Sequence, residues 1–274
     1  MMAFFGEQAD IKKESKMKKL QNVTYNQFFD ENSGFHSENF IYFSQCNPNG
    51  NLSLYELLKL TSDIAVEDFN QRGMSREFLK ENGIAILVSR DSFRIHKYPK
   101  ENQELKVYTK EEKSEPLQFV RSFEIESESG EKLVSGITSW LLVDLSNRRI
   151  MPIKKFDAMG FREPVTQSTE HDCLPYGKIK IPESIELFDK RTIKFSDLDA
   201  NGHTNNAKYA AFAVDALPFE FQKKEYKDFR INFAKEAMLG QKLEIYGFID
   251  NNSSTIIEIG KTEEGVSFEA EFKW

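Results

Sequence analysis

The chain has 274 residues, of which 39% are hydrophobic and 30% charged, so it is globular and long enough for two domains. Its formal net charge of −7 disfavours nucleic acid and anionic membrane as partners. Two cysteines, Cys46 and Cys173, give no disulfide framework, and no apolar run suits a membrane span or a signal peptide, so we expect a cytoplasmic protein.

The start of the chain is polar and weakly patterned. We predict an N-terminal extension over residues 1–37 that is partly disordered, residues 1–16 above all.

An internal repeat follows this extension. Residues 41–51 (IYFSQCNPNGN) are similar to residues 193–203 (IKFSDLDANGH), at an offset of 152 residues from Ile41 to Ile193. Each block predicts a short strand followed by a polar turn that contains glycine. The repeat therefore indicates two copies of one structural unit.

A helix is predicted after each block. Residues 53–70 carry apolar side chains at helical spacing, and a short second helix is expected at residues 75–81. Residues 205–216 are apolar almost all round, as is typical of a buried helix, and Pro218 follows as a stop signal. Further along the chain, residues 92–95 (SFRI) are similar to residues 228–231 (DFRI).

A run of strands completes each copy. The predicted strands are 84–98, 103–113, 117–128 and 132–144 in the first copy, and 226–235, 241–250, 254–262 and 265–273 in the second. A buried helix with antiparallel strands predicts an α+β fold. We expect two tandem hotdog domains, each a curved antiparallel sheet wrapped round a central helix, at residues 38–153 and 188–274. The proline-rich residues 154–187 form the predicted linker.

The two copies differ at three alternating positions of the turn. The first copy has three amides, and the second has a carboxylate, an amide and an imidazole: Asn47, Asn49 and Asn51 against Asp199, Asn201 and His203. Alternate residues of an extended segment point the same way, so the three residues of the second copy are expected to face one cleft. Only that copy has groups for activating water. We interpret Asn49 and Gly50 as residues that favour a turn for conformational reasons alone.

The start of the second helix adds electrostatic stabilisation. Thr204 or Asn205 is the expected cap, and unpaired N–H groups near Asn205 and Asn206 would stabilise negative charge on a carbonyl oxygen. The remaining histidines, His36, His96 and His171, read as surface or core residues. No metal-ligand spacing or phosphate-binding loop is visible, so no metal or cofactor is predicted.

The segment DLDANGHTNNAKY at residues 197–209 resembles the D-x-N-x-H-x-N-N-x-x-Y signature of the acyl-acyl carrier protein thioesterases. Further similar segments are NGNLSLYELLKLTSDIA at 49–65, GMSREFL at 73–79 and SWLLVDLSNRRIMPI at 139–153. The resemblance covers residues 38–274. It implies a fused double hotdog that hydrolyses the thioester between a fatty acyl chain and its carrier protein.

The resemblance also implies roles for residues. Asp199, Asn201 and His203 match the catalytic motif, and Glu236 matches its downstream glutamate. Ala237 stands where plant members often carry cysteine, which favours direct attack by water. We hypothesise that Glu236 is the general base, that Asn201 helps to position the water, that His203 assists by hydrogen bonding and that Asp199 orients the Asn201 and His203 side chains. Whether Glu236 or His203 takes the proton first is left open.

The substrate is expected to bind across both copies. By resemblance the acyl chain lies in the N-terminal hotdog, with four candidate lining residues: Leu57, Leu60, Ile64 and Ile86. Acyl carrier proteins are acidic, so a local basic patch is needed. The candidates are Arg148, Arg149, Lys154 and Lys155, with Arg72, Arg76 and Lys80 as the second choice.

Two other functions stay open from the sequence. The first is an acyl-CoA thioesterase of the same fold, and the second is a non-enzymatic acyl-binding hotdog protein. The sequence also leaves open a homodimer and the acyl chain length.

Overall fold

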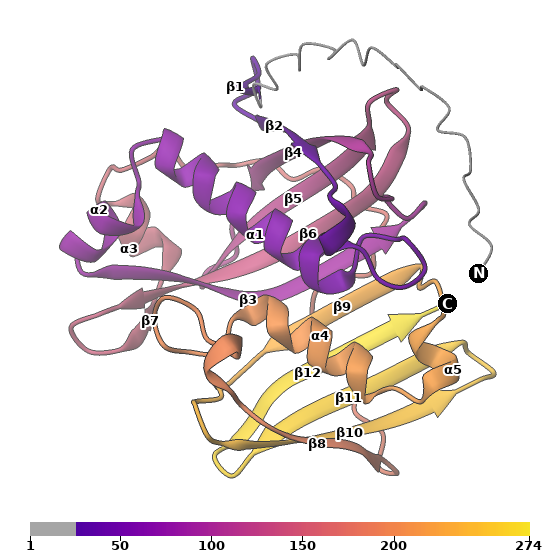
Figure 1. The fold of residues 1–274 in the computed structure, drawn as a ribbon. Helices are drawn as coiled ribbons and strands as arrows, with labels where there is room; N and C mark the ends of the chain where they lie inside the picture. The colour runs from indigo at the N-terminus through magenta and orange to yellow at the C-terminus, as the bar shows by residue number, and fades with distance from the viewer. Residues whose placement is uncertain (1–25) are drawn as a thin grey trace, which may run out of the picture.

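The computed structural model describes residues 26–274, so the disorder predicted for residues 1–16 lies outside the described part of the chain. The described residues form two halves, each with one long helix on the same face of a shared sheet (Figure 1). The helices are α1 (Leu54–Gln71) and α4 (Asn206–Ala216), and they pack against each other.

The N-terminal half contains seven strands and three α-helices among the described residues. Its remaining elements are β1 (Gln27–Phe29), β2 (Phe35–Phe40), η1 (Phe43–Gln45), α2 (Arg76–Glu81), β3 (Ile84–Ile95), β4 (Glu104–Glu112), β5 (Gln118–Ser127), β6 (Lys132–Asp144), β7 (Arg149–Met151) and α3 (Ile153–Asp157). The sheet therefore starts with two short strands, β1 and β2, that the sequence patterns did not predict.

The C-terminal half repeats the order of helix and strands. Its elements besides α4 are β8 (Glu186–Thr192), η2 (Phe195–Asp197), α5 (Phe219–Gln222), β9 (Asp228–Phe233), β10 (Lys242–Asp250), β11 (Thr255–Thr262) and β12 (Gly265–Lys273). The α+β double hotdog is thereby confirmed, with both helices and the eight predicted strands at their expected places.

A single antiparallel sheet joins the two halves. The strand order is β1-β2-β4-β5-β6-β3-β9-β12-β11-β10-β8, with β7 added to β6. The junction is the β3–β9 pair, in which Phe93 stands directly opposite Phe229. The similar segments at residues 92–95 and 228–231 are therefore the two strands that meet between the halves. Arg94 donates through Nε to Asp228 Oδ1 at 2.8 Å across this junction.

The repeated blocks at residues 41–51 and 193–203 do not begin with strands, so that prediction is wrong. β2 and β8 end at Phe40 and Thr192, before the apolar alternation starts, and a single 3₁₀ turn follows each. A side chain causes each turn, because Gln45 Oε1 accepts from the Tyr42 N–H and Asp197 Oδ2 accepts from the Lys194 N–H, both at 2.9 Å. These bonds bend the backbone away from the sheet.

Both long helices begin with a side-chain cap, and the caps are 152 residues apart in the chain. Ser53 Oγ accepts from the Glu56 N–H, and Asn205 Oδ1 accepts from the Ala207 N–H. Such caps satisfy donors that the first helical turn leaves unpaired. The cap of α4 is Asn205 and not Thr204, which settles the alternative left by the sequence.

The segment between the halves crosses the other face of the sheet. The Ser92 hydroxyl donates to the Leu174 carbonyl, and Asn232 Nδ2 donates to the Gly177 carbonyl at 2.8 Å. Cys173 packs with Val120 and Ile137. No helix within residues 26–274 combines the length and the apolar character needed to cross a membrane.

The C-terminal half buries one unpaired carboxyl group. Glu258 on β11 is 0% exposed, and neither of its carboxyl oxygens has a hydrogen-bond partner among the described residues. Burial raises the pKa of Glu258 well above its ordinary value of 4.5, so the folded state favours the protonated acid. The stabilisation from this raised pKa is complete below about pH 4.5 and is lost as the pH rises through the folded-state pKa.

We therefore predict that Glu258→Gln flattens the pH dependence of stability. The free energy of unfolding of the natural protein should fall as the pH rises above about 4.5, by up to about 1.4 kcal/mol per pH unit, and the variant should lose less. Urea unfolding at several pH values measures this. Glu263→Gln, an exposed change in the adjacent turn, is the control. Identical slopes for the natural protein and Glu258→Gln would contradict the assignment.

Candidate functional site

The residues predicted to be catalytic are organised by a tight turn just before α4. Asp199 Oδ1 accepts from the N–H groups of Asn201 at 2.7 Å and of His203 at 3.3 Å, and the Asp199 N–H donates to the His203 carbonyl at 2.8 Å. Gly202 has a φ of 81°, which favours glycine. The expectation of an extended segment is wrong, because the carboxylate folds the backbone around itself. Asp199 holds His203 through its backbone and not through its imidazole.

The first copy has the same turn with different side chains. Asn47 Oδ1 accepts from the N–H groups of Asn49 at 3.0 Å and Asn51 at 3.2 Å, and Gly50 has a φ of 74°. The buried Asn51 side chain donates to Glu225 at 2.9 Å and accepts from Lys100 at 3.0 Å. In this copy the amides therefore have structural partners.

In the second copy an imidazole faces a carboxylate instead. His203 Nδ1 lies 3.2 Å from Glu236 Oε1, and the two side chains are 37% and 45% exposed. Glu236 follows the end of β9, so a residue from the sheet meets a residue from the turn. This contact brings together two of the four residues that the sequence predicts to be catalytic.

Two buried hydroxyl groups fix the backbone next to Glu236. Thr204 Oγ1 donates to the Ala237 carbonyl at 2.6 Å, and the Ala237 N–H donates to the Tyr209 hydroxyl at 2.9 Å. All three residues are buried. Burial raises the pKa of Tyr209, so its hydroxyl stays neutral. No role was predicted for Tyr209, although this tyrosine ends the matched motif.

Asn201 reaches the other half of the molecule. Its Nδ2 donates to Asp199 Oδ2 at 3.3 Å, and its Oδ1 accepts from the Arg76 guanidinium on α2. Arg76 thus ties the N-terminal half to the turn of the C-terminal half. Its position beside the turn was not predicted, since Arg76 was expected only as a second candidate for carrier binding.

The first turn of α4 leaves a hydrogen-bond donor available. The Asn205 side chain takes the Ala207 N–H, whereas the Asn206 N–H has no acceptor within the described part of the chain. Such a group at a helix N-terminus attracts a developing negative charge. The geometry therefore gives Asn205 and Asn206 different tasks, a cap and a free donor.

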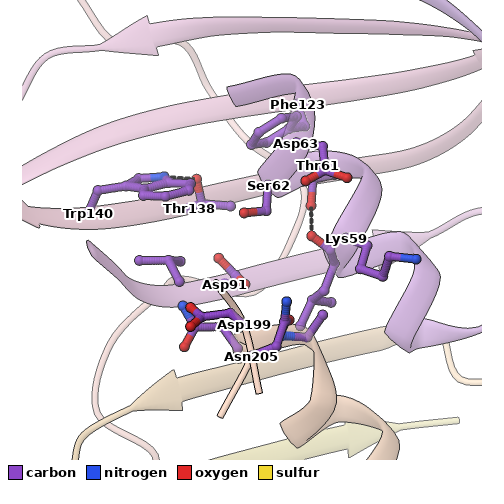
Figure 2. Close-up of a pocket in the computed structure, with 14 residues that line it drawn as sticks. Lys59, Thr61, Ser62, Asp63, Asp91, Phe123, Thr138, Trp140, Asp199 and Asn205 are labelled. Carbon is purple, nitrogen blue, oxygen red and sulfur yellow. Dashed lines mark hydrogen bonds between the residues drawn. The ribbon is translucent and has the colours of Figure 1, made fainter. Parts of the chain in front are cut away.

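A cavity between the two halves opens beside this helix start (Figure 2). Its walls come from α1, β3, β5, β6, the turn and α4. The lining residues are Leu58, Lys59, Thr61, Ser62, Asp63, Val88, Asp91, Phe123, Thr138, Trp140, Asp199, Asn205, Asn206 and Ala207. Asn201, His203 and Glu236 do not line it, so the contact of His203 with Glu236 lies outside its wall.

The four predicted acyl-chain residues are not the ones that line the cavity. Leu57 and Ile64 belong to the buried core, as Leu58 does, and Leu60 and Ile86 pack against that core. Leu58, the neighbour of Leu57, lines the cavity instead. Consecutive helical positions point about 100° apart, and the packing of α1 against the sheet decides which one faces the cavity.

The predicted carrier-binding residues are exposed. Arg148 lies in the turn between β6 and β7, Arg149 begins β7, and Lys154 and Lys155 lie on α3. Lys155 pairs with Asp144 at 3.1 Å. Among the described residues the other three have no carboxylate partner. Figure 1 shows β7 and α3 at the same end of the molecule as the first turn of α4.

The free cysteines lie elsewhere. Cys46 is in the first repeat block, and Cys173 is in the segment between the halves, where burial raises the pKa of its thiol to about 11. Within residues 26–274 no group of three His, Cys, Asp or Glu side chains has a metal-binding arrangement.

Comparisons with known proteins cover both halves. The acyl-ACP thioesterase N-terminal domain matches residues 32–157, and the acyl-ACP thioesterase C-terminal domain matches residues 183–273. A chloroplastic palmitoyl-acyl carrier protein thioesterase from Gossypium hirsutum is 24% identical over 196 residues, which are 69% of this chain and 47% of that protein. The chain thus spans about half the length of this curated relative.

Solved structures share the fold. An acyl-ACP thioesterase from Bacteroides thetaiotaomicron superimposes with a TM-score of 0.73 at 20% identity, over 89% of this chain and 98% of the other. The 12:0-ACP thioesterase from Umbellularia californica gives a TM-score of 0.71 at 17% identity, over 88% and 96%.

We predict that Thr204→Val destabilises the protein by about 1–3 kcal/mol, because the buried Ala237 carbonyl loses its side-chain donor. Denaturant unfolding measures this loss. Thr204→Ser keeps the hydroxyl group and is the matched control, with a smaller effect expected. If the valine variant were as stable as the serine variant, the hydroxyl bond would not be what holds the segment after β9.

Proposed function

Because the chain belongs to the acyl-ACP thioesterase family, we propose that it hydrolyses the thioester of a fatty acyl-acyl carrier protein and releases the free fatty acid. The observation that carries the proposal is the contact of His203 with Glu236 at the start of α4. Beside it, a cavity reaches into the N-terminal half, between α1 and the strands β3, β5 and β6. An acyl chain in this cavity would bring its thioester to the helix start.

His203 and Glu236 act as one unit in this proposal. With Nδ1 held on Glu236 at 3.2 Å, the neutral imidazole presents its unprotonated Nε2 to a water molecule. The geometry therefore favours His203 as the proton acceptor and Glu236 as the residue that orients it, the reverse of the sequence-based hypothesis. Asn201 contributes to the position of the turn through Asp199 and Arg76.

The reaction then needs two proton transfers. The water oxygen attacks the thioester carbon as its proton passes to His203 Nε2, and the Asn206 N–H stabilises the negative oxygen that forms. The tetrahedral intermediate collapses, the carbon–sulfur bond breaks, and the imidazolium returns the proton to the leaving thiolate. The products are the free acid and the carrier thiol.

We propose that the carrier protein docks on the basic end of the molecule. Arg148, Arg149 and Lys154 are exposed there, at the end of the sheet that carries the turn. An enzyme with a net charge of −7 needs such a local patch to attract an acidic partner. We place the reaction in the cytoplasm, where thiols such as those of Cys46 and Cys173 stay reduced.

We predict that His203→Ala and Glu236→Gln each lower turnover by about 100-fold or more, the scale of lost acid–base catalysis. Because the residues act together, the double variant should be no more than a few-fold worse than either single variant. Steady-state hydrolysis of an acyl-carrier thioester measures this.

Asn51→Ala is the matched control, since Asn51 occupies the position of His203 in the first copy. It should lower stability and leave turnover per folded molecule within a few-fold. Losses that multiply in the double variant would instead assign independent roles to His203 and Glu236.

We predict that the double charge reversal Arg148→Glu/Arg149→Glu lowers kcat/KM for an acyl-carrier substrate about tenfold or more and changes acyl-CoA hydrolysis little. The difference should shrink as salt rises, because exposed charges are screened over about 10 Å at 0.1 M. Lys223→Glu/Lys224→Glu, at the far end beyond α4, is the control. Equal losses on both substrates would exclude this patch and direct attention to Arg76.

A further inference from the structure

One buried carboxyl group that lines the cavity has no hydrogen-bond partner among the described residues. Asp91 on β3 is 6% exposed and lines the cavity, yet no hydrogen bond to its side chain exists within the described residues. Its backbone stands opposite Thr138 on one side and Ile231 on the other. Burial raises the pKa of Asp91 to about 8, so at neutral pH the group is mostly a protonated acid with a hydrogen to donate.

A second polar group in the same wall has spare capacity. Thr138 Oγ1 accepts from Trp140 Nε1 at 2.8 Å, and its own hydroxyl hydrogen has no acceptor in the described part of the chain. Thr61 differs, because its hydroxyl already donates to the carbonyl groups of Leu57 and Leu58. Asp91 and Thr138, on neighbouring strands, thus both have unused hydrogen-bonding capacity in this wall.

The same wall also contains apolar side chains. Leu58, Val88, Phe123 and Trp140 line the same cavity. A plain hydrocarbon chain would fit these side chains but would seal Asp91 and Thr138 away from water without partners. Each unsatisfied group costs about 1–3 kcal/mol. An acyl group with its own hydroxyl would remove this cost.

The position of Asp91 limits where that hydroxyl can be. In Figure 2, Asp91 lies between Thr138 and Ser62 on one side and Asp199 and Asn205 on the other. All of these residues line one cavity. Since the thioester is placed at the start of α4, whose residues Asn205 and Asn206 line the cavity together with Asp91, we expect a hydroxyl near the carbonyl to be the one that meets Asp91.

We infer that this cavity selects acyl groups that carry a hydroxyl within the first few carbons of the thioester, through a hydrogen bond to Asp91. The inference rests on the proposed function and deepens it, because it names a hydroxyacyl group as the substrate class. The hydroxyl oxygen accepts from the Asp91 carboxyl. A site built to bond a hydroxyl discriminates against the analogue that lacks it.

The test compares three substrates on the same carrier protein: β-hydroxydecanoyl, decanoyl and ω-hydroxydecanoyl thioesters. The natural protein should prefer the β-hydroxy substrate in kcat/KM by about tenfold or more, the equivalent of one hydrogen bond. The ω-hydroxy substrate should gain nothing. Asp91→Leu should lose the preference and Asp91→Asn, which keeps a donor, should retain most of it.

A binding measurement separates this inference from the proposed function. Amide analogues of the β-hydroxydecanoyl and decanoyl pantetheine thioesters cannot be hydrolysed, and calorimetry reports their affinity for the full chain. Tighter binding of the β-hydroxy analogue that is lost in Asp91→Leu supports the inference, whether or not the protein hydrolyses a thioester. A failure to hydrolyse any thioester would overturn the proposed function and leave the inference standing. Equal binding of both analogues, or hydrolysis of decanoyl and β-hydroxydecanoyl at equal kcat/KM, would overturn the inference.

Discussion

The pairing of β3 with β9 is the constraint on which the rest of the structure depends. It joins two sheets into one, and it puts α1 and α4 on the same face, where they pack against each other. Its register sets Phe93 opposite Phe229, and the ion pair of Arg94 with Asp228 bridges the two strands. A slip by one residue would turn every side chain of one strand to the opposite face. Asp91 would then leave the cavity.

The same junction explains how the site draws on both halves. β3 supplies part of the cavity wall, and its neighbour β9 leads directly into the segment that carries Glu236. Thr204 and Tyr209 bind the backbone at Ala237 and so hold Glu236 against His203. Cavity and acid–base pair are therefore set side by side by backbone pairing and two buried hydroxyl groups.

The two turns share one backbone arrangement and differ in the side chains that the turn does not need. Each turn docks against the opposite half, Asn51 on Glu225 and Asn201 on Arg76. The turn itself needs only a side-chain oxygen at its first position and a glycine near its end, as Asn47 and Asp199 both show. Chemistry could thus be added to one copy by changing side chains that the turn does not require. The imidazole of His203 is the clearest case.

Much of this arrangement was predictable from the sequence. Apolar periodicity predicted α1, α4 and the strands that follow them, and the 152-residue offset recurs between the caps Ser53 and Asn205. The turn was misread as extended because bonds from the Asp199 side chain to the backbone leave no trace in an alternating pattern. The choice of Leu58 over Leu57 depends on tertiary packing, as does the partnership of Thr204 with Ala237.

The proposed mechanism rests on direct hydrolysis of the thioester by a water molecule that residues of the C-terminal half activate. The most direct measurement follows single turnover of a β-hydroxyacyl-carrier thioester by the full chain in water enriched in ¹⁸O. The account predicts that free acid and carrier thiol appear together in equal amounts, with label from water in the acid and none in the protein. Retention of the intact thioester by a protein that binds it, or transfer of label to Glu236, would contradict the account.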